Sequence, residues 1–155
     1  APISDLIGAQ VKNYDVLADS YMAKVVAFNK SYNWNNWGDI LEAKSGTEVL
    51  AQYADQFYKG NAAVVTRRLG EGTVTYIGVD TDSSLLEFDI MKTVYERANV
   101  PTENYSDGLI VEWRDGFWIA LNYATDEVEV KIPKDSHIIL GKSKLKQSEV
   151  LIWKQ

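Results

Sequence analysis

Residue types that could carry out chemistry are few in this sequence, and what is missing excludes several classes of site. The chain contains no cysteine and a single histidine, His137. A disulfide framework, a thiolate zinc site, a cysteine nucleophile and any site that needs two imidazoles are therefore excluded. A Ser-His-Asp triad around His137 has no supporting G-x-S-x-G turn. The sequence predicts no metal site, no cofactor and no catalytic residue.

Four carboxylates could supply the pair that glycoside cleavage requires, one acid and one nucleophile or base. They are Glu112, Asp115, Glu127 and Glu129. All four fall at polar strand positions or in turns, within a segment that is too small to form a sugar-binding cleft. We interpret them as solvated surface groups.

Three aromatic residues form the best candidate for a binding surface. Tyr32, Trp34 and Trp37 lie among asparagine and glycine residues, and their segment, residues 29–39, is predicted to be a turn-forming loop. Rings in such a loop could stack on a sugar, insert into the pocket of a partner, or pack onto their own domain. The sequence leaves these three interpretations open.

Length and charge exclude further classes of protein. A chain of 155 residues forms one ordinary domain or two small ones. The net charge of −6 argues against nucleic-acid binding, and the short apolar runs predict no membrane span. The chain starts without an initiator methionine or a signal peptide, which is typical of a piece of a longer protein. Its compartment stays open, with a bacterial cytoplasm favoured over secretion.

The first two thirds of the chain predict strands and helices together. We expect a short helix that ends at Gly8, and strands over residues 21–28 and 40–43. Residues 47–58 fit helical spacing and period two equally, although their propensity favours a helix. Residues 62–69 and 73–79 predict a hairpin around Gly70 and Gly72, where glycine tolerates the positive φ of a tight turn.

The clearest element is a helix from about residue 83 to residue 98. Ser84 and Glu87 have the spacing of a capping box, and Asn99 can adopt the left-handed conformation that ends a helix. Apolar residues at helical spacing predict the stripe that packs on a sheet: Leu86, Ile90, Met91, Val94, Tyr95 and Ala98.

A polar stretch at residues 101–107 divides the chain, and we predict domains at residues 1–103 and 104–155. Beyond the division only short strands are expected. Asp115-Gly116 is a strong hairpin signal between residues 109–114 and 117–123. Further strands are predicted at residues 127–132, 137–140 and 149–153. The second domain is therefore expected to be a small all-β antiparallel, sandwich-like module.

Residues 48–82 resemble the end of the trimerisation domain of glycoside hydrolase family 42 β-galactosidases. Ala62 stands where that family usually has proline. Residues 5–15 (DLIGAQVKNYD) are similar to a leucine-glycine segment of the family, and residues 108–133 resemble its small C-terminal β domain, in which a strand ends in Leu-Asn. The positions that match the family pattern are Glu48, Val49, Leu50, Ala51, Tyr53, Phe57, Tyr58, Gly60, Ala63, Val64, Gly70, Gly72 and Tyr76.

The resemblance implies a fold and a function. Residues 47–53 would form a strand against their local propensity, in a truncated α/β, flavodoxin-like trimerisation domain whose first strands and helices lie before Ala1. The parent would hydrolyse terminal β-galactosides with carboxylates of an N-terminal (β/α)8 barrel, none of which is in this sequence. The chain would then be non-catalytic, serving assembly of a homotrimer and packing against its own catalytic barrel.

Two alternatives remain beside this interpretation. One is a free-standing carbohydrate-binding module that uses Tyr32, Trp34 and Trp37. The other is an amidotransferase-like α/β enzyme, which needs a nucleophile elbow and a Cys or His site that the sequence does not provide. In every case Gly60, Gly70, Gly72 and Gly116 are expected to be structural turn residues.

Overall fold

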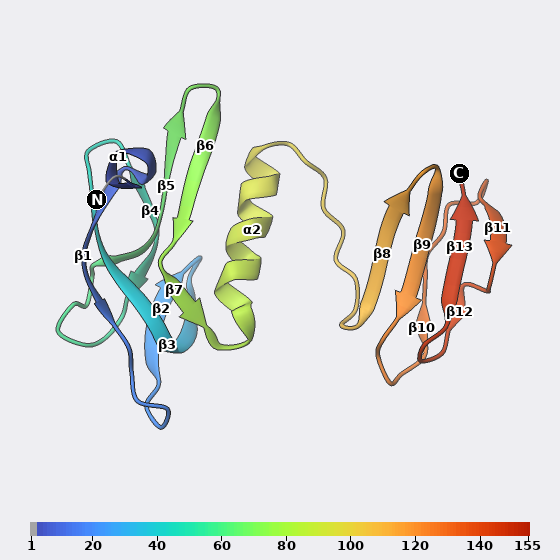
Figure 1. Cartoon of the computed structure of the whole chain (residues 1–155), viewed down its shortest axis with the longest axis horizontal. Coiled ribbons are helices and arrows are strands. Elements are labelled where there is room, and N and C mark those ends of the chain that lie inside the picture. The colour runs from blue at the N-terminus through green and yellow to red at the C-terminus, as the bar shows by residue number, and fades with distance from the viewer. Residues whose placement is uncertain (1–2) are drawn as a thin grey trace. The chain divides into compact units, whose positions relative to one another are not determined.

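The computed structural model describes residues 3–155, which form two compact units (Figure 1). The first unit ends at Thr102 and the second spans Glu103–Gln155. The first unit contains α1 (Ile3–Ile7), β1 (Ala9–Asp15), β2 (Ala23–Ala27), β3 (Lys30–Ala43), β4 (Glu48–Tyr53), β5 (Ala62–Leu69), β6 (Gly72–Ile77), β7 (Val79–Thr81), the 3-10 turn η1 (Asp82–Ser84) and α2 (Leu85–Arg97).

The first unit is built on one seven-stranded sheet in the order β1-β3-β2-β4-β5-β6, with β7 paired to β3. Every strand pair in the described part of this unit is antiparallel. The long strand β3 pairs with β1, β2, β5 and β7. Because its pairing with β5 joins the two ends of the path β3-β2-β4-β5, the sheet curls into a barrel-like ring.

The prediction of a flavodoxin-like α/β domain is wrong. A flavodoxin-like sheet is parallel, and each parallel connection needs a crossover of a dozen or more residues, usually a helix. Here β5 and β6 are joined by a two-residue turn. The single long helix of the described residues, α2, follows the last strand of the unit. By contrast, the strand expected at residues 47–53 is confirmed as β4.

The prediction of a loop at residues 29–39 is also wrong, because these residues form most of β3. Only Phe28 and Asn29 make the turn from β2, both with positive φ (52° and 59°), as a two-residue hairpin turn requires. In the strand that follows, Tyr32 and Trp34 point into the core, whereas Ser31 and Asn33 are exposed. The asparagine content obscured a period-two pattern that was present in the sequence.

Helix α2 packs on the sheet as predicted, through buried Leu86 and Ile90 and partly buried Val94. Its start differs from the expected capping box. Ser84 has positive φ and makes no side-chain cap. Instead, Glu87 Oε1 accepts a hydrogen bond from the Thr81 backbone N–H at 2.8 Å, and Glu87 Oε2 accepts one from the Thr81 hydroxyl. The cap therefore reaches across η1 to the end of β7.

The second unit has two antiparallel layers. One is the four-stranded sheet β11-β13-β9-β8 and the other is the short pair β10-β12. Their bounds are β8 (Leu109–Arg114), β9 (Phe117–Asn122), β10 (Val128–Glu129), β11 (His137–Leu140), β12 (Lys144–Leu145) and β13 (Val150–Lys154). Leu145 of β12 and Val130, the residue after β10, pack against Ala120, Leu151 and Trp153 of the larger layer. Of the strand expected at residues 127–132, only Val128–Glu129 forms a strand, β10.

The predicted turn glycines differ in their backbone conformation. Gly60, Gly70 and Gly116 have positive φ (89°, 59° and 89°), whereas Gly72 does not. Gly70 is the first central residue of the two-residue turn between Leu69 and Gly72, the position where a type II′ turn places glycine.

Replacing Gly70 with valine is expected to lower the free energy of unfolding by about 1–2 kcal/mol, because a β-branched residue resists the left-handed region. Gly72→Val is the matched control, since its backbone is not left-handed and an added Cβ would meet only the Leu69 carbonyl oxygen at 3.9 Å. Urea denaturation of both variants measures the difference. Equal effects of the two substitutions would contradict the assignment of the strained position to Gly70.

Candidate functional site

The three aromatic residues singled out in the sequence do not share one surface. Trp34 is fully buried (0% exposed) and packs edge to face on Tyr53, with ring centroids 5.4 Å apart. Tyr32 is buried beside it in the same core. Trp37 is 43% exposed, at an exposed position of β3 between buried Trp34 and buried Gly38. Only Trp37 is therefore available to a sugar or a partner.

Tyr32 joins β3 to α2. Its hydroxyl donates a hydrogen bond to Asp89 Oδ2 at 2.6 Å, and Lys30 Nζ pairs with the same oxygen at 2.8 Å. The hydrogen bonds from Lys30 and Tyr32 hold the pKa of Asp89 below its usual value. Burial, and then the bond to Asp89, raises the pKa of Tyr32. Tyr32 thus anchors the helix on the sheet and is not part of a binding platform.

Trp37 belongs instead to an exposed aromatic pair. Its ring stacks on that of Tyr14 from β1, with centroids 4.8 Å apart and planes at 6°. The Trp37 Nε1–H donates to Asp39 Oδ1 at 3.2 Å, and the Tyr76 hydroxyl donates to Asp39 Oδ2 at 2.5 Å. Burial, followed by the bond to Asp39, raises the pKa of Tyr76 to about 12. Asp39 therefore holds the Trp37 indole and links it to Tyr76.

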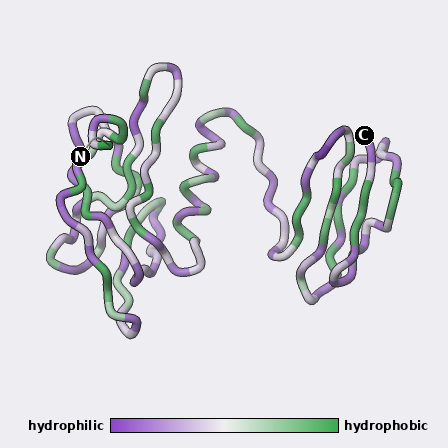
Figure 2. The backbone as a smooth tube through the Cα atoms, viewed as in Figure 1, coloured by the Kyte–Doolittle hydropathy of each residue, from purple (hydrophilic) through white to green (hydrophobic). Residues whose placement is uncertain are grey.

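Helix α2 carries a second apolar stripe that the sequence analysis did not separate from the first. Met91 and Tyr95, expected on the buried side, are exposed. With Leu85 and Phe88 they recur at helical spacing on the side opposite Leu86 and Ile90. We call these four residues the outer stripe of α2. Figure 2 shows the alternation of hydrophobic and hydrophilic residues along this helix.

The second unit also has an uncovered apolar face. An antiparallel sheet usually presents polar residues on the face away from its core. Here the face of β8, β9, β13 and β11 that points away from Ala120 and Leu151 is mostly aliphatic. Register places its members side by side across the strands: Ile110, Leu121 and Val150 in one row, and Ile119, Ile152 and Leu140 in the next. We call these six residues the outer sheet face.

Charged residues lie at one end of the outer sheet face. Glu112 and Arg114 line a shallow hollow over Ile119, and Lys154 Nζ lies 5.9 Å from the centroid of the Phe117 ring. An apolar centre with a polar rim is the composition of a protein–protein contact. Large exposed apolar patches with polar residues at their edge often mark sites of interaction with other proteins.

Potential metal ligands do not cluster in the part of the chain that the structure describes. Across residues 3–155 no group of three or more His, Cys, Asp or Glu side chains lies close enough to hold an ion. In the same part of the chain, no helix has the length and apolar character that crossing a membrane requires.

Comparison with known proteins places both units in one family. Residues 1–101 match the family model described as the β-galactosidase trimerisation domain, and residues 108–155 match that of the β-galactosidase C-terminal domain. The chain belongs to the family 42 β-galactosidases. The resemblance seen in the sequence is thereby confirmed, and the two units are the non-catalytic trimerisation and C-terminal domains of this family.

Individual family 42 β-galactosidases match nearly the whole chain. The β-galactosidase BgaH of Haloferax lucentense is 29% identical over 142 residues, covering 92% of this chain and 21% of that protein. The crystal structure of the cold-adapted β-galactosidase from Rahnella sp. R3 has a TM-score of 0.83 at 22% identity, covering 100% and 25%. The polyextremophilic β-galactosidase of Halorubrum lacusprofundi also has a TM-score of 0.83, at 25% identity, covering 100% and 24%. The chain spans about a fifth of the length of the curated relatives it matches.

Proposed function

We propose that this chain is the assembly part of an enzyme that hydrolyses terminal β-galactosides. In this proposal it holds together a homotrimer and packs against the catalytic barrel of its own polypeptide. The net charge of −6 gives no support to a nucleic-acid partner.

The observation that carries the proposal is the apolar surface that each unit leaves uncovered. The first unit exposes the outer stripe of α2 and the second exposes the outer sheet face. Phe88, at the centre of the stripe, is 60% exposed. Large aromatic side chains in such positions are typical anchors of protein interfaces. The burial of Tyr32 and Trp34 weakens the alternative of a three-ring sugar platform.

Expression of the chain alone, and of the complete reading frame that contains it, tests the proposal. We expect the chain alone to leave a chromogenic β-galactoside intact, and the complete protein to cleave it with the mass of three subunits in light scattering. Turnover by the chain alone that a point change within residues 1–155 abolishes would contradict the proposal.

Phe88→Asp is expected to separate assembly from folding. In the chain alone this exposed substitution should leave the melting temperature nearly unchanged. In the complete protein it should weaken the contact that covers the stripe by about 2 kcal/mol or more, roughly 30-fold in the equilibrium constant. Sedimentation and melting of the complete protein measure the loss.

Phe57→Asp is the matched control for this substitution, because Phe57 lies outside both apolar surfaces and its ring packs edge to face on Tyr58 of its own unit. It should leave sedimentation and melting of the complete protein unchanged. Identical behaviour of the Phe88 and Phe57 variants in the complete protein would show that the outer stripe of α2 is not a contact.

A further inference from the structure

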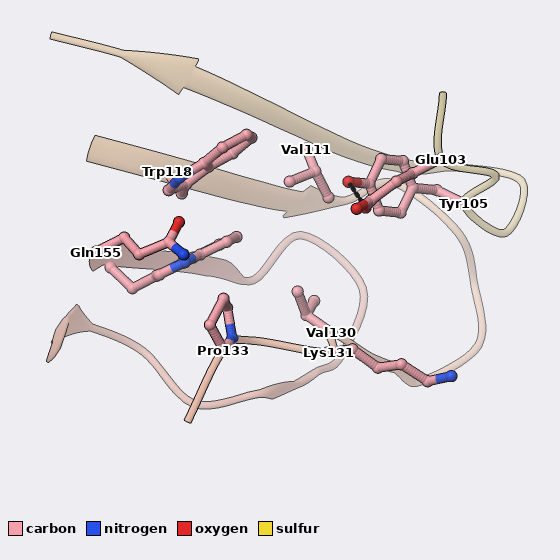
Figure 3. Close-up of a pocket in the computed structure, with 9 residues that line it drawn as sticks. Glu103, Tyr105, Val111, Trp118, Val130, Lys131, Pro133 and Gln155 are labelled. Carbon is pink, nitrogen blue, oxygen red and sulfur yellow. Dashed lines mark hydrogen bonds between the residues drawn. The ribbon is translucent and has the colours of Figure 1, made fainter. Parts of the chain in front are cut away.

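The second unit contains a cleft that is lined by none of the residues of the two apolar surfaces. It has a volume of about 230 Å³ and opens between the four-stranded sheet and the segment after β10. Figure 3 shows Trp118 and Gln155 at one end, Glu103 and Tyr105 at the other, and Val130 with Pro133 on the facing wall. The cleft thus has an apolar middle and two ends that carry polar groups.

Two tryptophans form the aromatic end. Trp118 of β9 and Trp153 of β13 both line the cleft, and their rings are stacked with centroids 6.0 Å apart at 13°. The Trp153 indole Nε1–H is buried and has no hydrogen-bond partner among the described residues. Buried donors without partners are uncommon in folded proteins and call for an explanation.

The opposite end supplies hydrogen-bonding groups. The Tyr105 hydroxyl donates to Glu103 Oε2 at 2.6 Å. Among the described residues nothing donates to the other oxygen, Glu103 Oε1. Burial, followed by the bond to Glu103, raises the pKa of Tyr105 to about 12, so the phenol stays protonated at neutral pH. Lys131 also lines the cleft, but its side chain points away from Glu103 (Figure 3).

We propose that this cleft binds one neutral pyranose ring of a saccharide. A pyranose has a C–H face that packs on aromatic rings and hydroxyl groups around its edge. The side chains of Trp118 and Tyr105 offer the rings, and Glu103 and Gln155 offer acceptors and donors for hydroxyls. Because Glu103 presents a carboxylate to the cleft, a neutral ligand whose hydroxyl groups can donate to it suits the cleft better than an anion does.

The size of the cleft limits the ligand. Pockets for drug-sized molecules run from about 300 to 1,000 Å³, so a cleft of 230 Å³ fits a single sugar ring. A second hollow of about 420 Å³ shares Glu103, Tyr105, Val130 and Lys131 with the first. A substituent on the sugar can extend into this hollow, which adapts the cleft to the end of a longer glycan.

Titration of the ¹⁵N-labelled chain with methyl β-D-galactopyranoside tests the proposal. The choice of a galactoside rests on the proposed function, and methyl β-D-glucopyranoside is titrated in parallel to test other pyranoses. The five tryptophans provide separate indole N–H signals. We expect saturable shifts of the Trp118 and Trp153 signals, and none at Trp37, with a dissociation constant on the order of 1 mM for a ligand of this size.

Substitutions at the polar end then locate the site without disturbing the core. Glu103→Gln is expected to weaken binding about tenfold by removing a charged acceptor, and Tyr105→Phe about fivefold. The matched controls are Glu112→Gln, on the opposite side of the sheet, and Tyr123→Phe, which does not line the cleft. Both controls should bind as the unchanged chain does.

Three results would overturn the proposal. These are no saturable shift with either sugar, shifts confined to tryptophans outside the cleft, and equal affinity of the Glu103 and Glu112 variants. The hydrolysis and mass measurements described for the complete protein do not depend on this cleft, so failure of sugar binding and failure of the assembly function are separate observations.

Discussion

Trp34→Ala is expected to lower the free energy of unfolding of the first unit by about 4 kcal/mol. Trp34 is fully buried and packs on Tyr53. Its ring also lies close to Gly38 of the same strand. Truncation removes the largest side chain of this core and leaves a cavity that the surrounding strands, held by their pairing, cannot close. Urea denaturation followed by far-ultraviolet circular dichroism measures the loss.

Trp37→Ala is the matched control, three residues along the same strand. Its ring is 43% exposed and stacked on Tyr14 alone, so the expected loss is below about 1 kcal/mol. A larger effect at Trp37 than at Trp34 would show that the aromatic pair with Tyr14, and not the buried ring, stabilises the unit.

Asn122→Ala is expected to destabilise the second unit by about 3 kcal/mol. Asn122 ends β9 and is 1% exposed. Its Nδ2 donates to the carbonyl oxygens of Asp126 and Leu145 at 2.8 and 2.9 Å, and its Oδ1 accepts from the Ala124 backbone N–H at 2.9 Å. Each lost bond contributes about 1 kcal/mol, and the backbone groups left behind have no replacement partners in the interior.

Calorimetry of the chain measures this effect, which corresponds to a fall of more than about 10 °C in the transition of the second unit. Asn104→Ala is the control, because Asn104 is exposed in the same unit and makes no hydrogen bond to the described residues. A melting curve of Asn122→Ala that matches that of the control would show that the three bonds do not hold the turn in solution.

Elements with local signals were predicted well from the sequence. The hairpin around Gly70, the hairpin at Asp115-Gly116 and helix α2 are all confirmed. Each depends on turn residues and periodicity within a short window, and these act before any tertiary contact is made. The resemblance to a family added β4, for which propensity alone favoured a helix.

Features that depend on distant residues were not predicted. The asparagines of β3 favour turns, but Lys30–Trp34 pair with β2, and Trp34 and Gly38 pair with the distant β7. This pairing overrides the turn propensity of asparagine. The true cap of α2 was missed because Thr81 lies six residues before Glu87, outside the spacing of a capping box. The cleft could not be inferred, since Glu103, Trp118 and Trp153 meet only in the folded unit.

The outer stripe of α2 has a signal in the sequence itself. Leu85 and Phe88 were visible as apolar residues at helical spacing, but a single stripe already explained the helix. A helix with apolar residues on two sides is normally covered on both. Reading the second stripe as a contact surface would have pointed to a partner for the helix from the sequence alone.

The closure of the sheet through β3 also governs when the first unit can fold during synthesis. A ribosome releases the chain from its N-terminus, and hairpins such as β2-β3 can form as soon as they emerge. The pairings of Leu41 with Ala62 and of Trp34 with Thr81 must wait until β5 and β7 have left the exit tunnel. Until then the backbone groups of β3 that pair with β5 and β7 stay unpaired, and this open strand edge can bind wrong partners. Nascent chains halted before Thr81 should therefore be the stage at which this protein most needs a chaperone.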